Sequence, residues 1–316
     1  MKLQDFLSKD TKFGMEAIAK DAELALQIQI RLIALGLLDP PSGGKFGPIS
    51  TAALKRFQDL MKCEEPNFLG QVTAEKLIET KVEDVPKPAI DLSLNNLPTR
   101  IIKYMQAKSY HFATGDSEFN IIYVEGMDGD GSVNNDAPNE FNDRRIVLEF
   151  VNGVPKIVGN WEATTEPGHH YTFNPMNKGG AARIKFGQYK AWRMGMHGTS
   201  APHRALVQVA PVSVHRDFNQ DFKRIGDFVD TGDYFAINQH WGYDYSRNDI
   251  ATASAGCLVG RTTQGHQEFL DIIEQDRRYL ATPIGAPVYP DDPNERTYVF
   301  ASTIIPGDEL VKMFPA

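Results

Sequence analysis

The decisive stretch of this 316-residue chain begins with Asn238-Gln239-His240-Trp241-Gly242 and ends, after a polar segment, with Ser254-Ala255-Gly256-Cys257-Leu258-Val259-Gly260. A free cysteine has a pKa of about 8.5, so roughly 3% is thiolate at neutral pH. A nearby imidazole can accept the thiol proton and later return it to a leaving group. The small residues 254–256 allow a sharp turn that exposes backbone N–H groups, which stabilise an oxyanion. The stretch therefore predicts Cys257 as a nucleophile and His240 as its base. The plainer alternative is a buried structural thiol beside an ordinary histidine.

The spacing of these residues resembles the signature of L,D-transpeptidases of the YkuD type, in which a His precedes Ser-x-Gly-Cys. The resemblance implies that Cys257 attacks the meso-diaminopimelate–D-alanine bond of a peptidoglycan stem peptide, with His240 as the base. Ser254 and Gly256 would shape the loop. The acyl-enzyme would pass to an amine, giving a crosslink, or to water, giving carboxypeptidase activity. The family usually has Arg two residues after the Cys, where this chain has Val259.

Five further side chains are expected to contact the substrate: His197, Arg261, Trp241, Arg144 and Arg183. Arg261 is the candidate replacement for the arginine that the family has at position 259. The segments 141–145 and 161–168 are dense in polar and turn residues and are interpreted as loops that carry binding groups. For His197, the alternative to a cleft position is a histidine satisfied by the backbone.

No metal or other cofactor is expected. The run Asp128-Gly129-Asp130-Gly131-Ser132, with Asn134 and Asp136, offers clustered oxygens, but it lacks the EF-hand glycine and its Glu140 comes one place late. A solvated acidic loop is favoured there. The histidines at 169, 170, 197 and 203 lack a recognised zinc spacing. Two alternatives to the cysteine enzyme stay open. One is a zinc-dependent peptidoglycan amidase or peptidase. The other is a non-catalytic wall-binding or phage or injection-particle protein that keeps the fold.

Net charge, cysteine positions and apolar runs limit the ligands and the cellular location that we expect for this chain. The formal net charge of -8 argues against nucleic-acid binding, which needs a basic surface. Cys63 and Cys257 lie far apart and give no disulfide framework. No apolar run approaches a membrane span, and Met1–Phe6 lacks the apolar core of a signal peptide. We expect synthesis in the cytoplasm and action on the cell wall after export, release or injection. Peptidoglycan is the predicted partner, and the oligomeric state stays open.

Residues 1–80 predict a small domain of three helices. Leu24, Ile28, Leu32 and Leu35 recur at helical spacing, and a turn-rich loop follows from Pro40 to Pro48. A second amphipathic helix covers 49–60, and Thr73 is the predicted N-cap of a third helix.

This region resembles the peptidoglycan-binding domain type 1 family. The resemblance is carried by four short motifs: Gln29-Ile30-Arg31-Leu32, Leu35-Gly36, Phe46-Gly47-Pro48-Ile49-Ser50-Thr51 and Phe57-Gln58, with an echo at Leu69-Gly70-Gln71-Val72-Thr73. The resemblance implies a module that binds the cell-wall polymer. A three-helix scaffold without a ligand is the alternative.

Residues 81–98 contain prolines and lack periodicity, which predicts a linker. Residues 99–316 then predict an L,D-transpeptidase-like domain. It would open with a helix at 99–107 and continue mostly as strands, at 120–124, 145–150, 155–158, 205–209, 212–214 and 298–300, with a late helix at 266–280. The expected fold class is α+β, a helical domain followed by a β-rich domain with peripheral helices.

Overall fold

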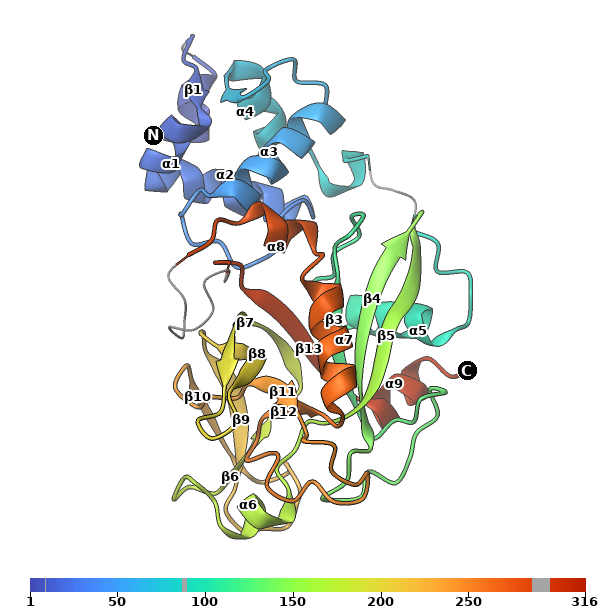
Figure 1. Ribbon diagram of the computed structural model, residues 1–316. Coiled ribbons are helices and arrows are strands. Elements are labelled where there is room, and N and C mark those ends of the chain that lie inside the picture. The colour runs from blue at the N-terminus through green and yellow to red at the C-terminus, as the bar shows by residue number, and fades with distance from the viewer. Residues whose placement is uncertain (9, 87–89, 286–295) are drawn as a thin grey trace. The chain divides into compact units, whose positions relative to one another are not determined.

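The computed structural model describes residues 1–8, 10–86, 90–285 and 296–316. The chain forms two compact units, Met1–Ala89 and Ile90–Ala316. The boundary between them falls inside the stretch predicted as a linker. The fold is α+β, because helices dominate the first unit and strands dominate the second (Figure 1). No helix in the described parts of the chain is long and apolar enough to span a bilayer.

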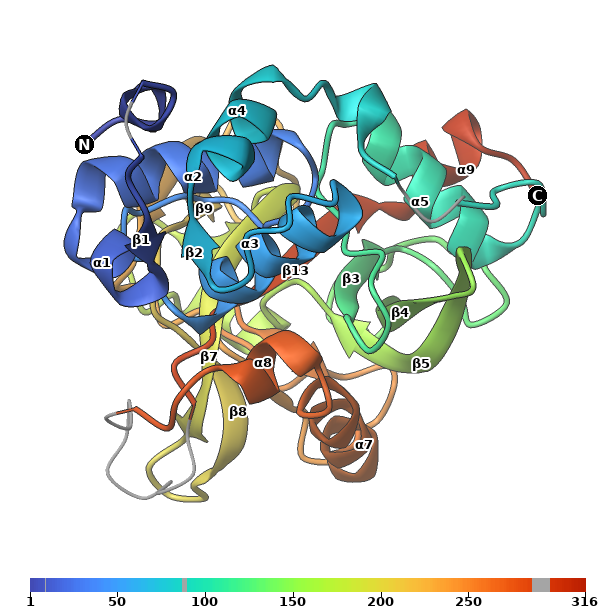
Figure 2. The ribbon, with the colours of Figure 1, turned by 90° about the horizontal axis from the view of Figure 1, so that it is seen from above.

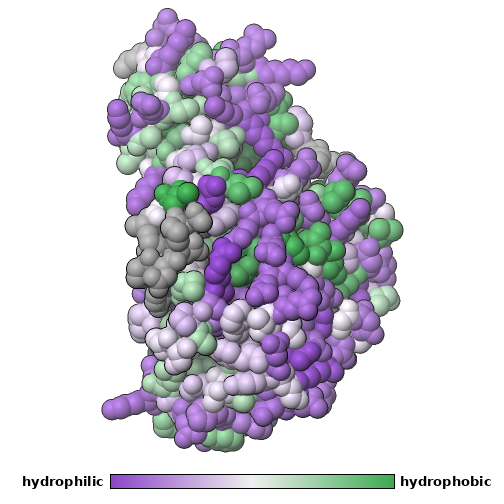
Figure 3. All heavy atoms as spheres, viewed as in Figure 1, coloured by the Kyte–Doolittle hydropathy of each residue, from purple (hydrophilic) through white to green (hydrophobic). Residues whose placement is uncertain are grey.

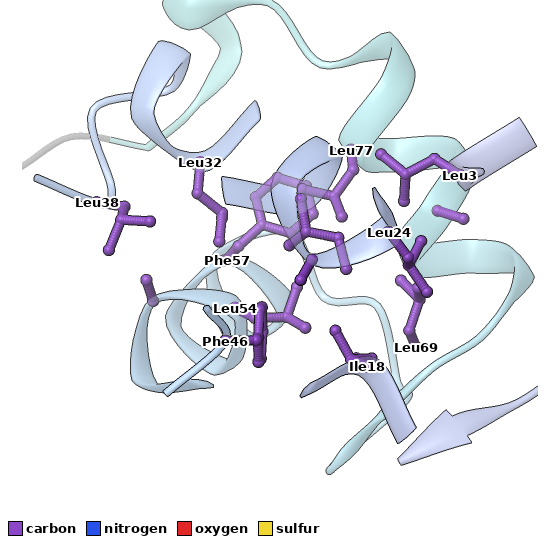
Figure 4. Close-up of a cluster of buried hydrophobic side chains, with 14 of the residues drawn as sticks. Leu3, Ile18, Leu24, Leu32, Leu38, Phe46, Leu54, Phe57, Leu69 and Leu77 are labelled. Carbon is purple, nitrogen blue, oxygen red and sulfur yellow. The ribbon is translucent and has the colours of Figure 1, made fainter. Parts of the chain in front are cut away.

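The first unit is helical. Its helices are α1 (Met15–Lys20), α2 (Ala22–Ala34), α3 (Pro48–Leu60) and α4 (Gln71–Glu79), with the 3-10 turns η1 (Leu3–Phe6) and η2 (Val82–Asp84) and a small ladder of β1 (Phe13–Gly14) with β2 (Phe68–Leu69). The apolar positions that repeat along α2 and α3 meet in one core. Figure 4 shows Leu24 and Leu32 of α2 beside Leu54 and Phe57 of α3 and Leu77 of α4.

Two buried glutamines hold the loops of the first unit. Gln29 donates from Nε2 to the carbonyl of Lys45 and to Ser50 Oγ, both at 2.9 Å, and its Oε1 accepts from the N–H of Gly44 at 2.9 Å. Gln58 donates to the carbonyl of Phe68 at 2.7 Å and to Thr73 Oγ1 at 3.1 Å. Both glutamines belong to the short motifs at 29–32 and 57–58, so these motifs hold the loops through side-chain hydrogen bonds.

The predicted cap of the third helix is wrong. Helix α4 begins at Gln71 after Gly70, two residues before Thr73. The side chain of Glu65, in the loop before β2, accepts from the N–H groups of Gly70, Val72 and Thr73 and so caps the helix. Thr73 is instead inside the helix, where its hydroxyl accepts from Gln58.

The second unit is built on a closed barrel of eight strands. In ladder order these are β11 (Gln239–Trp241), β12 (Leu258–Gly260), β5 (Val154–Thr164), β4 (Asp143–Val151), β3 (Asn120–Glu125), β13 (Phe300–Pro306), β7 (Gly187–His197) and β8 (His203–Gln208). A separate antiparallel sheet has the order β10 (Phe228–Gly232), β9 (Val212–Asp217) and β6 (Ala181–Ile184). The remaining helices are α5 (Leu97–Ala107), α6 (His169–Phe173), α7 (Thr263–Ile273), α8 (Arg277–Ala281) and α9 (Gly307–Met313).

Helices α5 and α9 pack against strands of the barrel, α5 against β5 and α9 against β13. Helices α5 and α9 lie side by side, as Figure 2 shows from above. Ile101, Ile102 and Met105 of α5 share one apolar cluster with Ile146 and Leu148 of β4. The face seen in Figure 3 is largely hydrophilic, with apolar residues in small separate patches.

The strands predicted at 120–124, 145–150, 155–158, 205–209 and 212–214 are confirmed, and so is a helix over 99–107, which begins two residues earlier. The last strand lies later than predicted, at Phe300–Pro306. The late helix is two helices: α7 ends at Ile273, and Asp276 is the N-cap of α8, where its side chain accepts from the N–H groups of Arg278 and Phe119 at 2.8 Å each.

The two segments predicted as polar loops belong partly to strands. Asp143 begins β4 and residues up to Thr164 continue β5, with Arg145 opposite Trp161 in the ladder. Asp143 and Arg145 are buried in β4 and hydrogen-bonded there, so polarity alone did not mark a loop.

We expect Gln29→Ala to destabilise the first unit by about 2 kcal/mol, because the substitution removes the buried hydrogen bond to Ser50 and leaves the partly buried N–H of Gly44 without an acceptor. Urea unfolding of the full chain, followed by far-UV circular dichroism, measures the effect. Tryptophan fluorescence serves as an internal reference, since Trp161, Trp192 and Trp241 all lie in the second unit. The matched control is Gln71→Ala at an exposed position, expected within about 0.5 kcal/mol of the unsubstituted protein. An unchanged midpoint for Gln29→Ala would show that the glutamine does not hold the loop.

Candidate active site

The predicted nucleophile and base are brought together by two short parallel strands. His240 lies in β11 and its Cα partner in β12 is Val259. Cys257 immediately precedes β12, and the next residue, Leu258, donates its N–H to the carbonyl of Asn238 at 2.9 Å. Side chains two residues apart on a strand share a face, so Asn238 and His240 point to the same side. Cys257 and His240 line one cleft of about 450 Å³.

Ser254 and Gly256 set the turn before the sulfur. The hydroxyl of Ser254 accepts from the N–H of Gly256 at 3.1 Å and donates to the carbonyl of Cys257 at 2.9 Å. Gly256 has φ +130°, and a Cβ at this position would lie 2.5 Å from the carbonyl oxygen of Ala182. Only glycine fits here, for both conformation and space.

His240 is held in one tautomer. Its Nδ1 lies 2.7 Å from the carbonyl oxygen of Trp241, so Nδ1 carries the proton and Nε2 keeps its lone pair. Its ring stacks on that of His197 with centroids 3.9 Å apart and planes at 10°. Burial, together with the neighbouring His197, lowers the pKa of His240 well below its ordinary value. The ring is therefore neutral, and its free nitrogen can accept a proton.

His197 is a neutral donor beside this base. Its Nδ1 accepts from the side-chain amide of Asn238 at 3.0 Å, which leaves the proton on Nε2. Burial lowers the pKa of His197 to about 4. The stacked rings therefore carry no charge at neutral pH, which removes the repulsion that two imidazolium ions would have.

The thiol of Cys257 is also neutral at rest. Its Sγ lies 3.4 Å from the carbonyl oxygen of Ala236, to which it donates. Burial raises the pKa of Cys257 to about 11. No direct hydrogen bond joins Sγ to His240 within the described residues. The arrangement suits transfer of the thiol proton to the imidazole during attack, in contrast to a preformed thiolate–imidazolium pair.

The structure places only some of the predicted substrate-binding residues at the cleft. His197 lines it. Trp241 stacks on His203 with centroids 3.9 Å apart and does not line the cleft. Val259, at the position where the family has arginine, is fully buried in an apolar cluster with Phe141 and Ile250.

The three predicted arginines have partners elsewhere. Arg261 pairs with Glu162 and, with Arg144, lines a different hollow of about 350 Å³. Arg144 donates to the side chain and carbonyl of Asn160 at 2.7 and 2.9 Å. Arg183 is buried and pairs with Glu166. None of the three lines the cleft of Cys257.

Among the residues at the cleft that were not singled out from the sequence are Arg216, Asn238 and Tyr243. A signal existed for Arg216. Val212, Val214 and Arg216 alternate with less buried residues along β9, so the period of two places Arg216 on the inner face of its sheet. Asn238 and Tyr243 flank the predicted histidine, but nothing in their spacing marks them.

Within the described residues, a group of possible metal ligands forms at Glu125, Asp136 and Glu166, whose oxygens lie within 4.8 Å of one another. Arg224 pairs with Glu125 and Arg183 with Glu166, so two of these carboxylates already have cationic partners. The histidines considered for zinc are not part of this group. His169, for example, packs its ring against Phe173 and Phe222.

Comparison with known proteins does not place the chain in a family. No protein-family model matches it, and no curated protein matches it. A solved structure that does match is a fused Zn-dependent amidase/peptidase/peptidoglycan-binding domain-containing protein from Clostridium acetobutylicum ATCC 824. That match has 12% sequence identity, covers 94% of this chain and 100% of the other, and has a TM-score of 0.27. At this TM-score the likeness carries neither fold nor function to this chain.

The neutral thiol gives a testable pH dependence. With a pKa of about 11 for Cys257, roughly one thiol in ten thousand is ionised at pH 7, and this fraction rises tenfold per pH unit. In a Cys63→Ala background, iodoacetamide should therefore modify Cys257 about tenfold faster for each unit between pH 7 and pH 9. Mass spectrometry of the modified peptide measures the rate. A plateau that begins below pH 8 would contradict this account, because it would indicate a thiolate stabilised at rest.

Proposed function

We propose that this protein is a cysteine-dependent acyl-transfer enzyme that acts on peptidoglycan stem peptides, as an L,D-transpeptidase or an L,D-carboxypeptidase. One observation carries the proposal: Cys257 and His240 open into the same cleft, with His240 in the tautomer that accepts a proton. The resemblance of this segment to the L,D-transpeptidase signature supplies the substrate class.

The first half of the reaction forms an acyl-enzyme. As Sγ of Cys257 attacks the carbonyl carbon, its proton passes to Nε2 of His240, directly or through one water. The C–N bond of the scissile peptide then breaks, and the imidazolium returns the proton to the leaving amine. The hydrogen bond from Nδ1 to the carbonyl of Trp241 keeps the ring oriented through both transfers.

The oxyanion formed during attack needs N–H donors that are not already hydrogen-bonded to another acceptor. The N–H of Cys257 has no acceptor within the described part of the chain, whereas the N–H of Gly256 is bound to Ser254 Oγ. We assign the N–H of Cys257 as one donor to the oxyanion. The Nε2–H of His197, which lines the same cleft, is available as a second polar contact for the substrate.

The second half of the reaction transfers the acyl group to an acceptor. An amine gives a crosslink and water gives a shortened peptide, with His240 taking the acceptor proton in either case. The first unit would raise the local concentration of the polymer around this site without changing its chemistry. Both the peptidoglycan partner and a site of action at the cell wall belong to this proposal.

A non-catalytic wall-binding protein that keeps the fold is a second candidate. The observation in its favour is the burial of Val259 at the position where the family has arginine. The turnover experiment described next decides between the enzyme and the non-catalytic protein.

Incubation with purified peptidoglycan fragments, followed by mass analysis, tests the proposal. We expect release of D-alanine or new crosslinks, and a thioester adduct on the peptide that contains Cys257. Cys257→Ala should abolish turnover, and His240→Gln should slow it by about 100-fold or more. Cys63→Ala, which removes the buried thiol of the first unit, is the matched control and should leave turnover unchanged.

Two results would reject the enzyme proposal. Full turnover in Cys257→Ala would exclude a thioacyl intermediate. Tight binding of fragments with no turnover by the unsubstituted protein would instead favour the non-catalytic candidate.

A further inference from the structure

Arg216 of β9 lines the cleft of Cys257 and was not part of the predicted site. The described residues around the cleft include no carboxylate, and Arg216 is their permanently charged member. The other lining residues are mostly apolar, aromatic or neutral polar, among them Tyr171, Phe235 and Tyr243. The lining therefore offers a ligand one guanidinium, which is ion-paired with Asp230, a residue outside the lining of the cleft.

Two independent contacts place Arg216 close to the nucleophile. In the β6–β9 ladder, Arg216 lies opposite Ala182, and the carbonyl of Ala182 packs directly against Gly256. On the other side, the guanidinium stacks 4.6 Å above the ring of Phe235.

The residue after Phe235 completes the second route, because Ala236 supplies the carbonyl that accepts from Sγ. Arg216 is thus connected to Cys257 through two sets of neighbours. Ala182 contacts Gly256, the residue before Cys257, and Phe235 precedes Ala236, which accepts from Sγ. Strand pairing and the lining of the cleft therefore agree that Arg216 and Cys257 lie in the same cleft.

The guanidinium of Arg216 is held by hydrogen bonds to Asp230, which occupy only some of its N–H donors. Its Nε and Nη2 donate to the same oxygen of Asp230, Oδ2, at 3.1 and 2.9 Å. Nη1 makes no hydrogen bond within the described parts of the chain, and it is not among the polar atoms sealed from solvent. Only 6% of the residue is exposed, so this group is held in place with one donor edge left for a ligand.

We propose that Arg216 binds a carboxylate of the acyl donor and thereby selects donors that carry a free carboxylate near the attacked carbonyl. Arginine suits this role because its planar donors match a carboxylate and its charge is permanent. The identification of the ligand as an acyl donor rests on the proposed function. The preference of the cleft for a carboxylate does not.

A purely structural role for Arg216 makes a different prediction. The pair with Asp230 joins β9 to β10, and a residue that served only this purpose would not distinguish anionic from neutral molecules at Cys257. Charge selectivity at the sulfur therefore separates the two roles.

Two alkylating reagents of similar size measure this selectivity. Iodoacetate and iodoacetamide both form an S–C bond with the Cys257 thiolate and release iodide, after the thiol proton is lost to solvent. Only iodoacetate carries a carboxylate. In a Cys63→Ala background, the iodoacetate-to-iodoacetamide rate ratio at Cys257 should exceed the ratio for free cysteine at the same pH.

Substitution of Arg216 should remove this preference. We expect Arg216→Gln to slow iodoacetate by about fivefold, the size of one partly screened ion pair, and to change the iodoacetamide rate by less than twofold. Arg216→Lys should retain much of the preference. Arg261→Gln is the matched control, because Arg261 lines the other hollow, and it should leave the ratio unchanged.

Two outcomes would overturn the inference. One is a ratio in the unsubstituted protein no higher than that of free cysteine, a result that needs no variant to fold. The other is an equal loss of both rates in Arg216→Gln. Alkylation requires no acyl transfer, so charge selectivity without turnover of peptidoglycan fragments would keep this inference and reject the proposed function.

Discussion

The site depends on the fully buried guanidinium of Arg145 of β4. Its Nη2 donates to the carbonyl of His240 in β11 at 3.1 Å and to that of Leu258 in β12 at 3.2 Å. Its Nε donates to the hydroxyl of Tyr123 at 2.6 Å, and its Nη1 lies 3.0 Å from His266 Nδ1. One nitrogen therefore bridges the strand that carries the base and the strand that follows the nucleophile. A charge that is buried without such partners would be strongly destabilising.

This bridge matters because β11 and β12 are only three residues long and run parallel. A short parallel ladder provides few hydrogen bonds of its own. Gly260 leaves room for the bridge, since a Cβ there would lie 2.6 Å from Nη1 of Arg145. The glycine that closes the decisive sequence stretch and the arginine of a distant strand thus fit each other. Together they fix the offset between His240 and Cys257, while the stacked His197 and the hydroxyl of Ser254 orient the ring and the turn.

Much of the fold follows from local patterns in the sequence. Helical spacing at Leu24 and Leu32 identifies α2, and β-branched runs identify β3 and β4, because these patterns depend on near neighbours in the chain. The juxtaposition of His240 and Cys257 in one cleft also follows from a short-range motif. The arginines are different. Arg144, Arg183 and Arg261 were expected at the substrate, yet each has a partner on another segment, and which segments meet depends on strand pairing. For the same reason, Arg145 and Arg216 gain their positions from contacts that only the assembled barrel and sheet provide.

The most direct test of this account is amide hydrogen exchange at Leu258, whose N–H donates to the carbonyl of Asn238 across the two strands. We compare Arg145→Lys with Arg144→Lys, its neighbour on the same strand, which contacts Asn160 and not the bridge. Exchange at Leu258 should become at least about tenfold faster in Arg145→Lys, by local opening of the strand pair, while β3 keeps its protection. In Arg144→Lys exchange at Leu258 should be unchanged. Unaltered protection of Leu258 in Arg145→Lys would contradict the claim that this guanidinium holds the two strands together.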